Sequence, residues 1–535
     1  MATKMILYWI LVLFFNTGLN AQIWFQIYGD SVNTLTKKVF EQYDKGYLFS
    51  GAQYQNAYFA NGWIMKTNIN GIKLWEKNFS IDNKFVQFFG ACIMPDGGMT
   101  EIGVTNKLSA NCYDPFIIRL NGCFEKEWCR VYNAPGCSCD GFDIVNTPEG
   151  GYIALMYRWK SGEQQQIWLF RLDSLGEVIW TNVYATDPDF WSELSHSLLK
   201  TTDSCFVITG EAYYPDPTYP NKWIIKIILI KVNMDGEVIF EVPWGTNNGI
   251  YSDGRLSTID SKNNIYTAGR RARKTAPFGD SPCLFKTSLS GEPVFYKDLK
   301  ENSIAGIATT INWFQDSSLV FCSQWKDNSG IDTTGVIKTD SFGNISMQKV
   351  FSDNYGIYAS CITFNDRLVL GGGFYSSGYL QSCAIKLNSS LEYDSIYTTP
   401  FTYDSLCPYP IVSDTVPLDD CQVVVVGIDE AQQNPETTKL KVYPNPADNR
   451  ITIEMPKYLV KKLKGNGITT TTIYNQWKEV RLEVFDLFSR LVFCETVPQE
   501  KKRVTFNVSE WSPGMYVARL VFMNEVAGRE KFVVE

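Results

Sequence analysis

GYLFSG at residues 46–51 opens a unit that recurs along the chain and sets its architecture. The unit continues with WIMK at 63–66, NING at 68–71 and LW at 74–75, and the same order of features returns within residues 151–180. Each copy contains an apolar strand after a turn, a variable loop, a second apolar strand that ends in a basic residue, a tight turn and an aromatic strand. The pattern therefore predicts a repeat of three to four short strands.

The basic residue gives the register of seven copies that are spaced by about fifty residues. These residues are Lys66, Arg119, Arg171, Lys231, Lys286, Lys338 and Lys386. A glycine follows in six copies, as a tight hairpin turn with positive φ requires. These glycines are Gly71, Gly122, Gly176, Gly236, Gly291 and Gly343.

Repeats of this length and strand content are typical of propeller blades. We predict an all-β protein whose residues 22–400 form a seven-bladed β-propeller, with six or eight blades as the alternatives. Residues 23–29, IWFQIYG, read as the aromatic last strand of a blade that stands before the first repeat. We expect this strand to complete the last blade and close the ring.

The N-terminus has the features of a secretory signal peptide, which we place at residues 1–21. Its apolar run is too short to span a membrane, and no other run is long enough. The formal net charge is −8 and the pI is about 5.1, which argues against nucleic acid as a partner because that role needs a basic face. Residues 401–438 read as a cysteine-bracketed segment and a polar linker.

The C-terminal residues 439–535 resemble the type A sorting domain of the type IX secretion system. The resemblance rests on an opening YPNP motif, a later glycine and tyrosine, and a final KFVVE. The residues are Tyr443, Pro444, Asn445, Pro446, Gly514, Tyr516, Lys531 and Val533. The resemblance implies a small immunoglobulin-like β-sandwich, export by the type IX secretion machinery, and a secreted or cell-surface protein. It also implies that the tail is cleaved and the mature protein is attached to surface glycolipid.

The chain contains 14 cysteines and one histidine. An exported chain with many cysteines is expected to form disulfides. The repeat register places Cys112 on the same face as Cys137 and Cys139, so we predict a bond between Cys112 and one of that pair. We also predict a bond between Cys407 and Cys421. The single histidine, His196, and the cysteine spacings suggest neither a metal site nor a cofactor.

The loops between the second and third strands of the copies are rich in aromatic residues, and one of them is basic. In a propeller these loops share one face, where ligands usually bind. The predicted ligand-binding residues are Tyr58, Trp159, Tyr214, Arg270, Arg271, Arg273, Trp325 and Tyr375. Aromatic rings with nearby polar groups suit sugars, and arginines suit acidic groups. We therefore predict a non-catalytic protein that binds glycan or protein ligands.

The alternative is a secreted glycan-degrading enzyme, of glycosidase or lyase type, on the same scaffold. A glycosidase needs two opposed carboxylates. The nearest pairs in the sequence are Asp140 with Asp143 and Asp187 with Asp189, and nothing else marks them as catalytic.

Overall fold

The computed structural model describes residues 24–535 except 30–31, 57, 110–111, 161–164, 185–191, 216–222, 245–251, 274–278, 301–302, 327–328, 352–354, 377, 427–437, 456–458, 466–467, 475–479, 487–489, 499–500 and 523–524. The described residues contain strands and no helix. Contacts divide the chain into two compact units, Met1–Ala431 and Gln432–Glu535. The predicted signal peptide lies outside the described residues.

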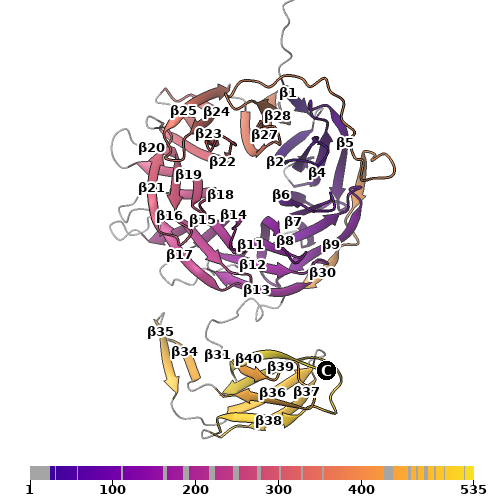
Figure 1. Cartoon of the computed structure of the whole chain (residues 1–535), viewed down its shortest axis with the longest axis vertical. Coiled ribbons are helices and arrows are strands. Elements are labelled where there is room, and N and C mark those ends of the chain that lie inside the picture. Colours follow the sequence, from indigo (N-terminus) through magenta and orange to yellow (C-terminus); the bar gives the residue numbers. More distant parts are fainter. Residues whose placement is uncertain are drawn as a thin grey trace, which may run out of the picture. The chain divides into compact units, whose positions relative to one another are not determined.

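The described part of the first unit contains seven sheets arranged in a ring, as Figure 1 shows. In each sheet, consecutive strands pair antiparallel, and the first strand lies nearest the axis of the ring. Three sheets consist of β2 (Asn33–Glu41), β3 (Tyr47–Tyr54), β4 (Ala60–Thr67) and β5 (Lys73–Ser80); β6 (Val86–Ile93), β7 (Met99–Ser109), β8 (Cys112–Leu120) and β9 (Lys126–Asn133); and β10 (Ser138–Asn146), β11 (Tyr152–Trp159), β12 (Gln166–Leu172) and β13 (Val178–Tyr184). This is the predicted all-β, propeller-like architecture.

The remaining four sheets complete the ring. They consist of β14 (Ser192–Lys200), β15 (Phe206–Pro215), β16 (Trp223–Val232) and β17 (Val238–Trp244); β18 (Ser252–Ile259), β19 (Ile265–Arg273), β20 (Gly279–Thr287) and β21 (Pro293–Asp298); β22 (Ala305–Trp313), β23 (Leu319–Lys326), β24 (Asp332–Thr339) and β25 (Ile345–Phe351); and β26 (Tyr355–Ile362), β27 (Leu368–Ser376), β28 (Tyr379–Leu387) and β1 (Phe25–Tyr28).

The N-terminal strand β1 closes the ring, as predicted for residues 23–29. It pairs antiparallel with β28, with Phe25 opposite Ile385. Trp24 is fully buried, and its Nε1 donates to the Ile69 carbonyl at 2.9 Å. These contacts join the last sheet of the ring to the first, so the ring is closed by strand pairing and by packing.

The recurring basic residue of each repeat lies on the third strand and in five sheets pairs with an acid in the turn between the first two strands. The pairs are Lys66 with Asp44, Arg119 with Asp96, Arg171 with Glu149, Lys231 with Asp203, and Lys338 with Asp316. In the β18–β21 sheet, Lys286 lies instead 4.6 Å from the ring centroid of Tyr266. In the last sheet, Lys386 pairs with Asp394 at 3.2 Å.

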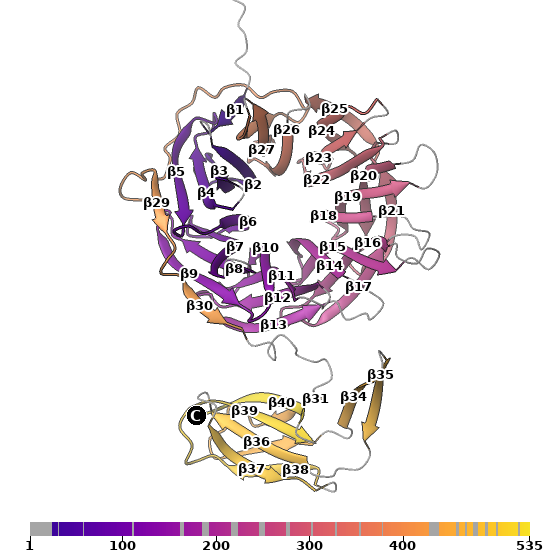
Figure 2. The same ribbon diagram turned by 180° about the vertical axis from the view of Figure 1, so that it is seen from behind.

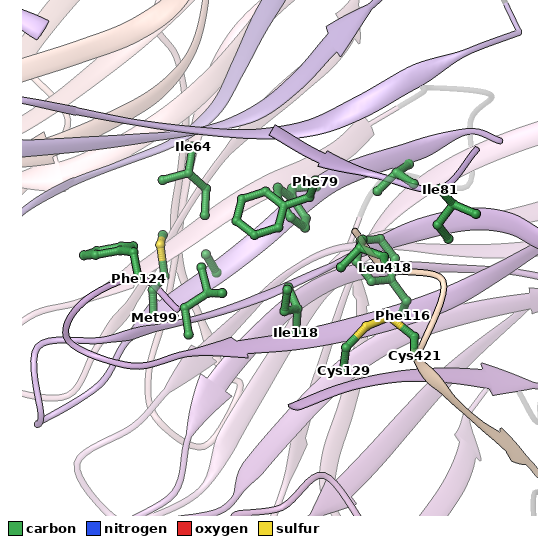
Figure 3. Close-up of a cluster of buried hydrophobic side chains, with 14 of the residues drawn as sticks. Ile64, Phe79, Ile81, Met99, Phe116, Ile118, Phe124, Cys129, Leu418 and Cys421 are labelled. Carbon is green, nitrogen blue, oxygen red and sulfur yellow. A yellow bond between two sulfur atoms is a disulfide. The ribbon is translucent and has the colours of Figure 1, made fainter. Parts of the chain in front are cut away.

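Apolar side chains of neighbouring sheets meet between them. Figure 3 shows one such cluster, in which Ile64 and Phe79 face Phe116 and Ile118 of the next sheet. The residues between them along the strands, such as Met65 and Ile117, are also buried and belong to the clusters on the opposite faces, so each of these two sheets is packed on both sides. Leu418, from much later in the chain, is fully buried in the same cluster.

Leu418 belongs to a segment that we call the strap, residues 388–426, which runs along the outside of the ring. Its strand β29 (Asp414–Pro417) pairs parallel with β5, and β30 (Gln422–Val425) pairs parallel with β9. Figures 1 and 2 show both strands outside the sheets that they extend. The strap thus covers sheet edges that would otherwise leave backbone groups unpaired.

Two disulfides attach the strap to the β6–β9 sheet, and their pairing corrects the prediction. Cys123 bonds to Cys407 and Cys129 bonds to Cys421, with Cα separations of 5.0 and 4.7 Å. The predicted bond between Cys407 and Cys421 is therefore wrong. The strap extends along the sheet, so its two cysteines reach different cysteines of the sheet instead of each other.

The predicted bond from Cys112 is also absent, because Cys112 is a free thiol. The backbone N of the next residue, Tyr113, donates to Ser138 Oγ at 3.2 Å, so the two segments are adjacent. Cys137 and Cys139, however, are buried in the apolar cluster between the β6–β9 and β10–β13 sheets, and Cys112 is not part of that cluster.

The second unit is a β-sandwich. One sheet contains β31 (Thr438–Lys439), β40 (Glu525–Val534), β39 (Gly514–Phe522), β36 (Val480–Asp486) and β37 (Leu491–Thr496); the other contains β32 (Lys441–Tyr443), β33 (Arg450–Glu454) and β38 (Arg503–Asn507); and β34 (Leu459–Gly465) and β35 (Ile468–Tyr474) form a hairpin. Side chains of both sheets, such as Ile453 and Leu482, form one buried core.

The two ends of this unit meet. Asn445 Oδ1 accepts a hydrogen bond from the backbone N of Val533 at 2.9 Å. The ring of Tyr516 stacks on that of Phe532 with a centroid separation of 5.8 Å. The opening motif and the terminal residues that carry the resemblance are thus parts of one fold.

Candidate functional site

A pocket of about 620 Å³ lies at one end of three neighbouring sheets, β18–β21, β22–β25 and β26–β28 with β1. At this end, first strands begin, second strands end and third strands begin, so it is the end that carries the loops between second and third strands. The lining residues are Arg270, Asp280, Ala305, Gly306, Ile307, Gln324, Trp325, Lys326, Asp332, Thr333, Thr334, Tyr355, Gly356, Tyr358, Gly373, Tyr375 and Leu380.

Three of the predicted ligand-binding residues line this pocket: Arg270, Trp325 and Tyr375. Tyr375 is 59% exposed, whereas Trp325 is only 5% exposed because most of its ring packs into the core next to β22. Lys300 Nζ lies 5.0 Å from the Trp325 ring centroid. Tyr375 therefore offers an open aromatic surface, and Trp325 contributes a smaller part of its ring.

The charged residues of the pocket are paired with one another. Arg270 lies 2.7 Å from Asp253 and 3.6 Å from Asp280. Lys326 lies 3.3 Å from Asp332. Arg270, from the predicted basic cluster, is thus held by two carboxylates of its own sheet.

The neighbouring Arg271 is held in the same way. It lies 3.5 Å from Asp298 and 4.8 Å from the ring centroid of Tyr296. The side chain of Arg273, the third arginine of the predicted cluster, lies outside the described part of the chain.

The other predicted residues do not line the pocket. Tyr58, in the loop after β3, is 78% exposed, and Trp159, at the end of β11, is 41% exposed. Tyr214, near the end of β15, is half-buried, and Lys226 Nζ lies 4.5 Å from its ring centroid. Each belongs to a different sheet, at the same end of the sheets as the pocket.

A feature that sequence analysis missed is a β-bulge at the same place in each of the seven innermost strands. Each bulge leaves one residue without a partner on the second strand, and we call these residues the axial belt. They are Lys37, Phe89, Phe142, His196, Arg255, Thr309 and Tyr358. A bulge breaks the alternation of the strand and redirects a side chain.

Belt residues from neighbouring sheets contact one another. The rings of Phe89 and Phe142 lie 5.8 Å apart, and Arg255 Nη1 lies 3.4 Å from His196 Nδ1. Lys37 Nζ lies 5.8 Å from the Phe89 ring centroid and 5.2 Å from that of Tyr358. The bulges thus point these side chains toward a common zone at the axis.

One carboxyl near the belt has an altered acidity. Asp140 lies opposite Tyr157 on β11, and burial raises the pKa of Asp140 to about 6. Asp143 pairs with Lys38 at 2.9 Å, and His196 lies 3.6 Å from Glu211. Among the residues that the structure describes, no group of three or more His, Cys, Asp or Glu side chains is placed to hold a metal ion.

Residues 441–535 match the family described as the secretion system C-terminal sorting domain. The C-terminal unit is a type IX secretion sorting domain. This chain is therefore a secreted or outer-surface protein, and the secretion machinery is one of its partners. In the described part of the chain, no helix is long and apolar enough to cross a membrane.

Solved structures similar to this chain include propellers and polysaccharide lyases. A PL25 ulvan lyase bound to -[GlcA(1-4)Rha3S]- has 8% identity and a TM-score of 0.46, with 68% of this chain and 96% of that chain covered. The β-propeller domain of the Trilobed protease from Pyrococcus furiosus has 10% identity and a TM-score of 0.41, with 69% and 100% covered. A protein of unknown function from Dyadobacter fermentans has 8% identity and a TM-score of 0.41, with 69% and 98% covered. Comparison with curated proteins found no sequence match.

Proposed function

We propose that the exported propeller binds a glycan in the pocket between the β18–β21, β22–β25 and β26–β28 sheets. The observation that carries this proposal is the pocket itself, because it joins an exposed aromatic ring, Tyr375, with polar side chains such as Gln324 and Thr333. Sugar rings present C–H faces that pack on aromatic rings and hydroxyl groups that need hydrogen-bond partners.

The pocket geometry also fits a short oligosaccharide. Its volume of about 620 Å³ lies within the range of small-molecule sites. The aromatic surface lies to one side, at Tyr355, Tyr358 and Tyr375, and the ion pairs of Arg270 and Lys326 lie elsewhere in the lining. Tyr58, Trp159 and Tyr214 stay predictions, as contacts for a longer chain.

The test is a glycan array probed with the mature protein and with Tyr375→Ala. We expect Tyr375→Ala to weaken binding by about tenfold, because an aromatic face in contact with a sugar contributes on the order of 1 kcal/mol or more. Tyr409→Ala is the matched control, since Tyr409 is 50% exposed on the strap, away from the pocket. Binding that survives Tyr375→Ala unchanged, or the absence of binding to every glycan, would contradict the proposal.

A second array, of acidic peptides, separates glycan from peptide ligands. If the protein binds no glycan but binds acidic peptides, and Tyr375→Ala weakens that binding, the pocket is a ligand site but the ligand class that we propose is wrong. The affinities of the wild-type protein and of Tyr375→Ala, measured for both peptide and glycan probes, distinguish the two ligand classes.

A second candidate function, an enzyme that degrades acidic glycans, rests on Asp140. A carboxyl with a pKa of about 6 can act as a general base or acid near neutral pH, and Asp140 lies across from Tyr157. Lyase action produces an unsaturated sugar that absorbs in the ultraviolet, so incubation with polyuronates detects it. Loss of such activity in Asp140→Asn would favour the enzyme, whereas no activity in the wild-type protein favours binding alone.

The stages of export complete the proposal. We infer that residues 1–21 are a signal peptide, that residues 22–400 form the sheets of the propeller, and that 439–535 are the sorting domain. Of the intervening residues 401–438, those up to 426 belong to the strap that is paired and disulfide-bonded to the propeller sheets, and the remainder precedes the sorting domain in sequence. Cleavage of that domain would leave the propeller attached to surface glycolipid. Mass spectrometry of the mature protein tests both cleavage sites.

A further inference from the structure

Both basic residues that line the pocket are paired with carboxylates, so neither is available as an unpaired cation for an acidic ligand. Arg270 is paired with Asp280 within the lining, and Lys326 is paired with Asp332. A ligand that binds only these groups must compete with carboxylates that already hold them. Any preference for acidic sugars has to come from a cation outside these pairs.

Lys37 is such a cation. It is the bulge residue of β2, and no carboxylate among the described residues lies within 4.0 Å of its amine. The neighbouring Lys38 pairs with Asp143 at 2.9 Å, and the other cation of the axial belt, Arg255, pairs with Asp253 at 3.0 Å. Burial lowers the pKa of Lys37.

Lys37 is also connected to the pocket. Its Nζ lies 5.2 Å from the ring centroid of Tyr358, and Tyr358 is 39% exposed and lines the pocket. Phe89 belongs to the next sheet along the chain, and its ring centroid lies 5.8 Å from the same amine. Two aromatic rings therefore border the amine without supplying an anion.

We propose that Lys37 receives the acidic group of a glycan whose sugar ring lies against Tyr358, so that the site selects carboxylated or sulfated sugars. This inference rests on the glycan-binding function proposed above and names the ligand class. A partly buried ammonium without a carboxylate is costly, and a bound anion removes that cost. Hydrogen bonds to charged groups are also stronger than neutral ones.

The experiment measures affinities for two matched pairs of probes. The first pair is trigalacturonate and its methyl ester, and the second is a sulfated galactan oligosaccharide and its desulfated form. We expect the wild-type protein to prefer the acidic member of at least one pair by about tenfold or more, as a charge-assisted bond implies. The pair that shows the preference identifies the anion as a carboxylate or a sulfate.

Variants assign the preference to Lys37. Lys37→Met keeps the length and apolar stem of the side chain and should abolish the preference, so that both members bind equally. Lys37→Arg should retain it. Lys262→Met is the matched control, because Lys262 is exposed in a turn at the opposite end of the sheets.

The outcomes separate this inference from the proposed function. If Tyr375→Ala weakens glycan binding but Lys37→Met keeps the acidic preference, Lys37 has no such role and the pocket still binds glycans. The inference also fails if the wild-type protein does not distinguish the members of either pair. If no glycan binds at all, both proposals are wrong. Thermal unfolding of each variant confirms that it is folded.

Discussion

The recurring basic residue shows how one position can serve the same purpose in successive repeats. Lys66 Nζ lies 2.8 Å from Asp44, and both side chains are 1% exposed. Asp44 Oδ1 also accepts a hydrogen bond from the backbone N of Gly46 at 3.0 Å, so the pair ties the third strand to the turn before the second. Where the turn has Lys262 in place of an acid, Lys286 instead lies over Tyr266.

This arrangement predicts a large loss of stability from a change at one buried position. Lys66→Met should lower the free energy of unfolding by about 3–5 kcal/mol, because Asp44 is left as a buried charge without its partner. Lys73→Met, which removes a surface pair with Glu76, should cost at most about 1 kcal/mol. Equal losses in the two variants, measured by urea unfolding of the full chain, would contradict the buried-pair interpretation.

At the scale of elements, the strap holds the outer edge of the ring by four kinds of contact. Its strands extend two sheets, its apolar side chains such as Leu418 enter the core, and its cysteines bond to Cys123 and Cys129. Lys107 Nζ donates to the carbonyls of Asp419 and Cys421 at 2.7 and 3.0 Å. The strap is therefore an integral part of the propeller unit.

We expect the two disulfides to contribute measurably to stability. Replacing Cys407 and Cys421 with serine should lower the free energy of unfolding by about 2–4 kcal/mol for each bond removed. Cys494→Ser, which changes an exposed thiol in the sorting domain, is the control and should leave the propeller transition unchanged. Peptide mapping without reduction should recover the pairs Cys123–Cys407 and Cys129–Cys421, and any other pairing would refute this assignment.

At the scale of the full chain, the protein joins a ring of sheets to a separate sandwich that carries its export signal. In the sandwich, the first strand β31 pairs parallel with the last strand β40, and the backbone N of Ala447 donates to the Val533 carbonyl at 2.9 Å, so the two ends of this unit depend on each other. A truncation at either end of this unit removes part of its core.

Deletion of residues 441–535 should leave the propeller folded but trapped in the periplasm. A shorter deletion that removes only the last five residues should have the same effect, because Phe532 and Val534 are buried in the sandwich core. Cell fractionation with surface proteolysis measures this, and normal surface delivery of either truncated protein would disprove the role of the unit.

Local sequence was enough to predict the repeat and the export signal. Turn residues must allow positive φ, and strand residues must alternate, so both leave a readable pattern at short range. Even here one detail differed: in the second repeat the left-handed residue is Phe124, with φ 58°, two positions after the predicted Gly122. Phe124 is 2% exposed, so burial of its ring between sheets accounts for its place in the turn.

Contacts between residues far apart in the chain could not be predicted from local sequence and are known only from the folded ring. Disulfide pairing depended on the course of the strap, which no local pattern records. The neutralisation of Arg270 by Asp253 and Asp280 arises from the pairing of strands β18, β19 and β20 within one sheet. The contact of Lys37 with Tyr358 arises because closure of the ring brings the first and last sheets together. Patterns with a period of two or of fifty residues reflect local backbone geometry, whereas partners across sheets are set by packing, and packing is a property of the folded chain alone.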